Sequence, residues 1–226
     1  MTKKEFLNKY WKHYLLLEQD FLETKNFVEL SVDNYKTYSI KYMKIILSVC
    51  GEIDCVLKEY CKIFDAGYNK NCIKDYREDI IGFEKSDASV ESLGDQTIKV
   101  YNGIDLKPWQ NWYVGSDSTP VWWKAYNKIK HDRTGINNIG GAMIESFKAA
   151  NLEYALNALA ALYQVLLNFY RKIVNPSDQV KIPLNCSELF TLSSSYWDSV
   201  EFHYVYIIGI DSSGYLNITN QFDSVK

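Results

Sequence analysis

Apolar residues recur at intervals of three and four along three long stretches of the chain, which is the spacing of one face of an α-helix. The pattern predicts helices over residues 3–24, 39–64 and 147–173. Ser39 is a residue type that caps helix starts, and Pro176 ends the third pattern because proline cannot continue a helix. Alanines are interspersed in the third stretch, so we expect a neighbouring helix to approach it closely.

Two shorter helices are predicted between these stretches, over residues 72–84 and from Pro120 to about residue 133. Ser118 and Thr119 precede Pro120, and their hydroxyls are suited to cap that helix. Residues 97–112 are expected to be irregular or extended, because apolar and polar residues alternate there and a proline interrupts them.

The last part of the chain changes from helical to β character. Residues 201–208 are aromatic and β-branched, residues 212–214 are a Ser-Ser-Gly turn sequence, and residues 215–219 read as a second strand. We therefore expect a mainly α fold, a helical bundle with a short C-terminal β hairpin. Because about forty residues rarely fold alone, residues 1–180 are assigned to one helical domain and residues 181–226 to a β appendage packed on it.

The composition is that of an ordinary globular protein of 226 residues, 47% hydrophobic and 23% charged, with a formal net charge of −3. This balance demands neither nucleic acid nor an anionic membrane as a partner, so such binding must come from a local patch. The five cysteines match no metal-binding or disulfide spacing and are expected to be reduced. Because we find no signal peptide and no bilayer-spanning segment, we expect a cytoplasmic protein that does not contact membranes.

Residues 122–133 form one such patch, with two tryptophans directly before a basic and polar cluster, WWKAYNKIKHDR. On a helix the apolar side chains of this segment share one face. The side chains beside that face are Lys130, Trp123, Asn127 and His131, with Lys124 and Lys128 further towards solvent. A histidine, an amide and cations at the rim of an aromatic face are typical of an acid–base or phosphate-binding site.

The same residues also have a structural interpretation. Adjacent tryptophans on a helix point in different directions, which favours Trp122 and Trp123 as core anchors over a base-stacking platform. His131 is equally well interpreted as a surface or interhelical histidine with one hydrogen bond. The glycine-rich residues 135–141 lack the Gly-Lys-Ser/Thr ending of a phosphate loop. A binding site and a helix-packing motif therefore both remain open.

The second predicted helix carries acidic residues that we expect to meet this patch. Asp54 falls on its apolar face, close to Glu52, and a buried carboxylate needs a partner. The candidate partners are Lys58 on the same helix and, further along the chain, Lys130, His131 and Arg133. We predict that Asp54 or Glu52 lies within hydrogen-bonding reach of one of the last three. His13 and His203 lie among aromatic residues and are expected to be packing residues.

Residues 21–61 (FLETKNFVELSVDNYKTYSIKYMKIILSVCGEIDCVLKEYC), residues 120–133 (PVWWKAYNKIKHDR) and the alanine-rich helix that follows resemble a group of uncharacterised bacterial proteins. Their helical core in turn resembles the HEPN (higher eukaryote and prokaryote nucleotide-binding) superfamily. The first resemblance covers roughly residues 1–175. The looser HEPN resemblance implies a helical bundle that forms a homodimer and works in a toxin or antiphage defence system. Many HEPN proteins are metal-independent endoribonucleases.

The HEPN signature is an arginine followed, after four to six residues, by a histidine at a helix terminus. By resemblance the histidine maps to His131, with Asn127 as a polar companion. Of the three positions where the arginine would stand, only Lys124 is cationic, and lysine lacks the planar fork of arginine. Arg133 follows the histidine instead.

The resemblance and the basic cluster together predict a metal-independent endoribonuclease or an RNA-binding protein that needs no cofactor. In the enzyme His131 is the general acid or base, Lys130 and Arg133 stabilise charge on the phosphate, and Asn127 orients either group. The expected substrate contacts are Lys124, Lys128 and Trp123, and the supporting residues are Asp54, Glu52 and Lys58. The expected partners are RNA or a nucleotide, a second copy, and an antitoxin or defence-system protein. The alternative is a non-catalytic interaction or nucleotide-sensing module in which the motif is structural.

Overall fold

The computed structural model describes residues 1–86, 91–115, 118–174 and 186–193 in full, and the backbone of residues 206–210 and 216–220. This part of the chain is mainly α, as predicted. The helices are α1 (Lys3–Phe6), α2 (Lys12–Leu22), α3 (Ile40–Cys61), α4 (Ile73–Ser86), α5 (Val121–His131) and α6 (Leu152–Ile173). The strands are β1 (Thr97–Val100), β2 (Asp105–Leu106), β3 (Ile136–Ile139), β4 (Ala142–Glu145), β5 (Phe190–Ser193), β6 (Tyr206–Ile210) and β7 (Leu216–Asn220).

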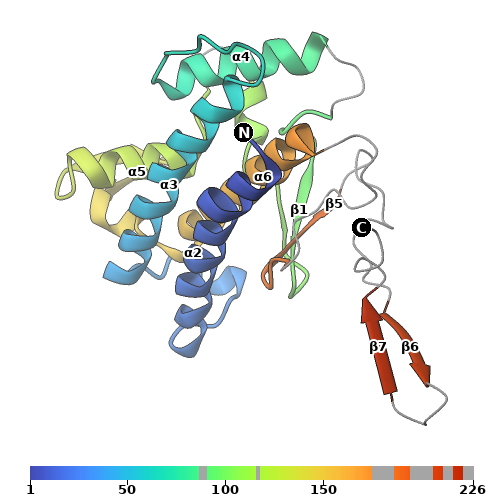
Figure 1. Cartoon of the computed structure of the whole chain (residues 1–226). Helices are drawn as coiled ribbons and strands as arrows, with labels where there is room; N and C mark the ends of the chain where they lie inside the picture. Colours follow the sequence, from blue (N-terminus) through green and yellow to red (C-terminus); the bar gives the residue numbers. More distant parts are fainter. Residues whose placement is uncertain (87–90, 116–117, 175–185, 194–205, 211–215, 221–226) are drawn as a thin grey trace.

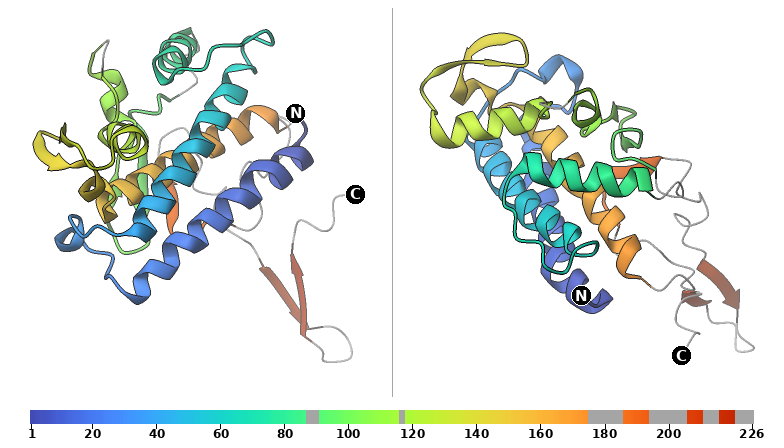
Figure 2. Two further views of the ribbon diagram at one scale, coloured as in Figure 1. Left: turned by 90° about the vertical axis from the view of Figure 1, so that its left-hand side faces the viewer. Right: turned by 90° about the horizontal axis from the view of Figure 1, so that it is seen from above.

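Helix α6 lies at the centre of the fold, because nearly every residue from Tyr154 to Tyr170 is buried. Helix α3 packs most extensively against it, and α2 and α5 also contact it (Figures 1 and 2). The alanines of α6, among them Ala155, Ala158 and Ala161, are fully buried. Because an alanine side chain is a single methyl group, these positions let neighbouring helices approach closely, as predicted.

The predicted helix boundaries are correct at some ends and wrong at others. The first predicted helix is continuous from α1 to α2 through one wider π turn, Leu7–Trp11. The Ser39 hydroxyl caps α3 by accepting from the Tyr42 N–H at 3.1 Å, as expected. Helix α6 begins five residues later than residue 147, because the Asn151 side chain accepts from the Tyr154 N–H at 2.9 Å and fixes the start there.

A small antiparallel sheet with strand order β2-β1-β5 covers one side of the helices (Figure 1). Ile98 pairs with Leu192 and Val100 pairs with Phe190, and all four side chains are buried. The rings of Phe190 and Tyr163 of α6 lie 5.6 Å apart. Strand β5, which belongs to the predicted C-terminal appendage, is therefore part of the main hydrophobic core.

A buried carboxylate joins the segment before β5 to helix α2. Glu18 is only 3% exposed and accepts hydrogen bonds from Tyr14 Oη at 2.6 Å, from Ser187 Oγ and from the Glu188 N–H at 3.1 Å. The Leu189 N–H completes the set at 3.4 Å. Donors alone satisfy this carboxylate, because no cation pairs with it among the described residues.

Strands β6 and β7 pair antiparallel, as the predicted C-terminal hairpin requires. The predicted turn and residues 201–205, which include His203, lie outside the described residues.

None of the described helices is long and apolar enough to cross a membrane. Two polar residues that interrupt α6, Gln164 and Asn168, are buried, and their side-chain N–H groups donate to Gln96 Oε1 at 3.2 and 2.9 Å. Gln164 Oε1 has no hydrogen-bond partner among the described residues.

Candidate functional site

The start of α5, which carries the predicted site, is fixed by Pro120 and by tryptophan contacts. Pro120 is the N-cap residue, and its carbonyl accepts from the backbone N–H groups of Trp123 and Lys124, each at 3.0 Å. The prediction of a hydroxyl cap was wrong, because no side chain caps α5 and the Ser118 hydroxyl donates to Gly115 O instead. The Trp122 indole N–H donates to Pro108 O at 2.9 Å and holds the helix against the preceding loop.

The apolar face of α5 lies in the core, as the periodicity predicted. Trp122, Trp123, Tyr126 and Ile129 are all buried, and the Trp122 ring also packs edge-on against Trp109. Trp123 is only 5% exposed and its ring packs between Trp122 and Tyr126. The assignment of Trp123 as a substrate contact is therefore not supported, because a buried ring cannot stack on a nucleotide base.

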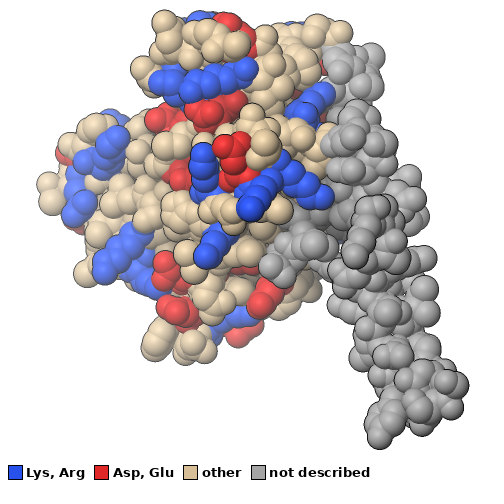
Figure 3. All heavy atoms as spheres, in the orientation of Figure 1, with Lys and Arg blue, Asp and Glu red and all other residues tan. Residues whose placement is uncertain are grey.

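The opposite face of α5 and the residue pair after it form an exposed basic surface. We call this surface the basic helix end; it consists of Lys124, Lys128, Lys130, His131 and Arg133. All five side chains are exposed, and none forms an ion pair with a described carboxylate. Figure 3 shows lysine and arginine side chains over this part of the molecule, at the left of the view.

Three of these residues share one strip along the helix. Lys124, Lys128 and His131 are separated by four and three residues, so they lie one above another on neighbouring turns. Seven residues of helix correspond to about 10 Å along the axis. Lys130 lies further round, where its Nζ contacts the Tyr126 hydroxyl at 3.3 Å and lies 5.4 Å from the centre of the Tyr126 ring.

His131 has no fixed hydrogen-bonding partner within the described residues. It is exposed, and Asn127, the predicted companion, is half-buried one turn earlier and forms no hydrogen bond to it. A catalytic histidine is normally oriented by a second group that fixes its tautomer. In a single copy of the chain, His131 and Asn127 therefore lie on the same helix end, but they do not form a hydrogen-bonded acid–base pair.

The loop after α5 holds Arg133 beside the helix end. Asn137 Nδ2 donates to Asp132 Oδ2 at 2.8 Å and to Ser146 Oγ at 3.0 Å, and the Phe147 N–H donates to Arg133 O at 2.9 Å. A Cβ at Gly135 would lie 2.1 Å from the Asp132 carboxylate, so a larger residue there would have to displace the Asp132 side chain from its contact with Asn137. The backbone at Arg133 is therefore tied to the following hairpin.

That hairpin, β3–β4, was missed by the sequence analysis, which considered residues 135–141 only as a possible phosphate loop. Gly140 and Gly141 have φ angles of 64° and 85° and connect Ile139 to Ala142 as a two-residue turn. Two glycines between short β-compatible segments are a known hairpin signal. The signal was therefore present in the sequence.

The predicted supporting acids lie elsewhere. Glu52 forms an ion pair with His13 across α2 and α3, with Oε2 3.0 Å from Nδ1. Asp54 lies close to Tyr76 of α4, whose hydroxyl pKa is raised mainly by burial and further by the Asp54 charge. Lys58 donates to the Asn71 side chain rather than to Asp54. The predicted contact between these acids and the basic helix end was wrong, because periodicity places a side chain on a face without identifying its neighbour.

The pair of His13 and Glu52 also corrects the interpretation of His13 as a packing residue. Its side chain is 45% exposed, whereas that of Glu52 is 12% exposed. Burial raises the pKa of the Glu52 carboxyl, and the neighbouring His13 partly opposes this effect. The two residues join α2 to α3 at the surface.

A second polar site that sequence reasoning did not find surrounds Glu84 of α4. Glu84 Oε2 accepts from Tyr113 Oη at 2.7 Å, and Oε1 accepts from the Leu93 N–H at 3.0 Å, at the edge of a pocket of about 260 Å³. Burial raises the pKa of Glu84 to about 7, although both hydrogen bonds oppose the shift. Both carboxyl oxygens of Glu84 accept hydrogen bonds from groups of the same chain, so we interpret Glu84 as a structural residue that fixes the segments around Leu93 and Tyr113.

Comparisons with family models, curated proteins and solved structures find no match to this chain. In the described part of the chain no group of three or more His, Cys, Asp or Glu side chains is placed to hold a metal ion.

Proposed function

We propose that the protein binds RNA through the basic helix end, by charge attraction to the phosphate backbone. The observation that supports this proposal is a cluster of four exposed cations without ion pairs to described carboxylates: Lys124, Lys128, Lys130 and Arg133. Some lysines elsewhere on the surface are instead compensated by an acidic neighbour. Those paired with a carboxylate are Lys9, Lys36, Lys41, Lys62 and Lys70.

Cations in the last turn of a helix also stabilise the helix itself. This structural role can be compared with the number of cations present, because the negative charge that they would neutralise at the helix end is known. A helix C-terminus carries about half a negative elementary charge. Asp132 adds one more, and its carboxylate is already engaged by Asn137. Four cations against these charges leave a local excess of about two and a half positive charges, which is more than helix capping requires.

The proposal is for binding without base-specific contacts and without cleavage. Trp122, Trp123 and Tyr126 are buried, so α5 exposes no tryptophan or tyrosine ring and the surface offers mainly charge rather than stacking. Contacts made to phosphates by charge carry little sequence information. Cleavage requires an oriented acid–base pair, and His131 has no described partner that would supply one.

The direct test measures affinity for a short fluorescently labelled single-stranded RNA, by anisotropy at low salt in the presence of EDTA. A variant with Lys124→Ala, Lys128→Ala, Lys130→Ala and Arg133→Ala should bind at least about tenfold more weakly, because it loses all four cations of the surface. The same samples show by gel electrophoresis whether the RNA stays intact.

A charge-matched control variant carries Lys4→Ala, Lys12→Ala, Lys44→Ala and Lys107→Ala. These lysines are exposed, form no ion pair with a described residue and lie outside the basic helix end. The control should bind RNA nearly as tightly as the wild type. Equal loss in both variants, or no RNA binding by the wild type at low salt, would contradict the proposal.

A further inference from the structure

The β3–β4 hairpin lies directly beside the basic side of α5. A Cβ at Gly140, in the turn of the hairpin, would lie 3.3 Å from Val121 Cγ1, at the start of α5. Because the hairpin begins where α5 ends, it runs back along the helix (Figures 1 and 2). Val121, Lys124 and Lys128 are separated by three and four residues, which places them on one side of α5. The hairpin therefore flanks the strip of Lys124, Lys128 and His131.

The two faces of this hairpin differ in their environment. The inner face packs into the molecule, since Ile139 is only 1% exposed and Ile144 packs against the core. The outer face carries Ile136 and Met143, which are 70% and 67% exposed. The strand register makes these two residues diagonal neighbours, about 7–8 Å apart. Their side chains therefore form one apolar surface in contact with water.

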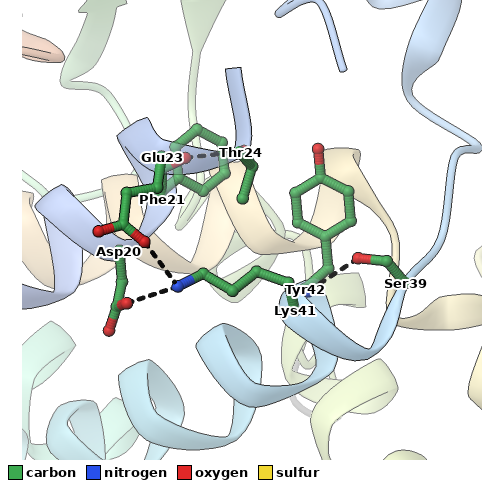
Figure 4. A network of polar contacts seen from close by, with 7 residues as sticks. All are labelled: Asp20, Phe21, Glu23, Thr24, Ser39, Lys41 and Tyr42. Atoms are coloured by element: carbon green, nitrogen blue, oxygen red, sulfur yellow. Dashed lines mark hydrogen bonds and ion pairs between the residues drawn. The ribbon is translucent and has the colours of Figure 1, made fainter. Parts of the chain in front are cut away.

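The charge beside this apolar surface differs from the charge at another exposed apolar side chain. Phe27 is 88% exposed and lines a pocket at the end of α2 together with Lys41. Lys41 Nζ contacts Asp20 Oδ1 at 2.6 Å and Glu23 Oε2 at 3.1 Å (Figure 4), so two carboxylates already share this cation. The cations next to the hairpin form no ion pair with a described carboxylate. The hairpin side therefore suits a ligand that combines apolar surface with negative charge.

An RNA strand with unpaired bases has both properties. Its bases expose apolar faces and its phosphates carry the charge, whereas a duplex stacks the base faces inside and leaves only their edges accessible. Glu145 pairs with Ile136 on the outer face of the hairpin, and its charge would repel a phosphate placed there. This arrangement assigns the phosphates to α5 and the bases to the hairpin.

The composition of the hairpin argues against an anionic membrane as the ligand. Insertion into lipid depends on buried apolar area, but the turn of the hairpin consists of Gly140 and Gly141, which have no side chain. Asn138 and Glu145 also share the outer face with the two apolar residues. Burying an amide and a carboxylate in lipid is costly.

We infer that the outer face of β3–β4 selects single-stranded RNA, with unpaired bases against Ile136 and Met143 and with phosphates on the strip of α5. This inference rests on the proposed RNA binding and adds the class of RNA that is bound. The contacts with the bases are independent of sequence, because every base has an apolar face.

The test compares three short, fluorescently labelled RNA ligands of equal length by anisotropy, with the full chain at low salt in EDTA. They are a strand of uridines, a strand without bases and a duplex. The wild type should bind the uridine strand about 3- to 10-fold more tightly than the base-free strand, the effect of covering roughly 50 Å² of apolar surface.

The variant that carries Ile136→Thr and Met143→Thr removes the apolar surface and keeps residues suited to a strand. It should bind the uridine strand about 3- to 10-fold more weakly than the wild type, with unchanged affinity for the base-free strand and the duplex. The matched control carries Phe27→Thr and Val32→Thr, which replace two exposed apolar residues outside the hairpin. The control should bind all three ligands like the wild type, and thermal unfolding checks that both variants keep the fold.

Two results would overturn this inference and leave the proposed RNA binding intact. In the first, the wild type binds the uridine and base-free strands equally tightly. In the second, the hairpin variant binds the uridine strand as tightly as the wild type. No binding of any of the three ligands by the wild type would overturn both proposals. If the hairpin variant lost binding to phosphatidylserine vesicles but kept its RNA affinity, the outer face would be a membrane-binding surface instead.

Discussion

At the scale of single residues, the described part of the chain contains two buried carboxyl groups that are held by hydrogen-bond donors rather than by cations. Glu18 accepts from three neighbouring donors at the start of β5 and from Tyr14. Glu84 accepts from only two donors, Tyr113 Oη and the Leu93 N–H. Fewer donors leave the cost of burying the charge less well compensated, which is why burial dominates the pKa of Glu84.

The raised pKa of Glu84 predicts how stability depends on pH. Its carboxyl titrates near 4.5 when unfolded and at about 7 when folded. The folded state therefore holds the proton more tightly, so this group contributes stability that is fully present below pH 4.5 and is lost as the pH rises to about 7. Two and a half pKa units correspond to at most about 3 kcal/mol.

Glu84→Gln should abolish this contribution, because the amide does not titrate. Urea unfolding of the wild type and the variant across this pH range measures the effect. The wild-type free energy of unfolding should fall relative to that of Glu84→Gln as the pH rises. Parallel curves for the two proteins would show that Glu84 titrates normally.

At the scale of elements, periodicity predicted the long helices and the residues that face the core, because both follow from local spacing. It did not place the start of α6, where Asn151 competes with the apolar pattern and fixes the first turn. It also left β3–β4 unassigned, although Gly140 and Gly141 supply the positive φ angles of a hairpin turn. End positions and turns depend on a few hydrogen bonds and dihedral angles, which an apolar pattern does not record.

Replacing glycine by alanine should have opposite effects in the β3–β4 turn and in α4. Gly141→Ala should destabilise the protein by about 1–2 kcal/mol, because alanine is strained at a φ of 85°. Gly140→Ala should cost more, since the new Cβ would also lie 2.5 Å from the Tyr154 hydroxyl. Gly82→Ala, in α4 with open space around it, should stabilise by up to about 1 kcal/mol.

Thermal or urea unfolding of the three variants measures these differences. The predicted order of stability is Gly82→Ala, wild type, Gly141→Ala and Gly140→Ala. If Gly140→Ala were as stable as Gly141→Ala, the contact with Tyr154 would contribute nothing.

At the scale of the whole molecule, the mainly α class followed from the sequence, whereas the long-range contacts did not. Strand β5 pairs with β1 almost a hundred residues earlier, and Glu18 holds the chain just before β5. The same distinction between local and long-range features applies to the candidate site. The exposure of Lys124, Lys128 and His131 follows from helical spacing, but the partners of Glu52 and Asp54 depend on how separate helices pack.

The proposed RNA binding depends on a local positive charge in a chain whose net charge is −3. Global charge would repel RNA weakly, so binding must depend on contacts at the basic helix end and must be sensitive to salt. Four phosphate contacts predict that the logarithm of affinity falls with the logarithm of salt concentration with a slope of about −3. From 50 to 200 mM salt the affinity should then fall by about 50-fold.

The most direct measurement is this salt slope for single-stranded RNA, in the wild type, the four-residue variant of the basic helix end and the charge-matched control. The proposal predicts a slope of about −3 in the wild type and the control, and a slope close to zero in the variant. A wild-type slope near zero, or the same slope in all three proteins, would show that the basic helix end does not bind RNA.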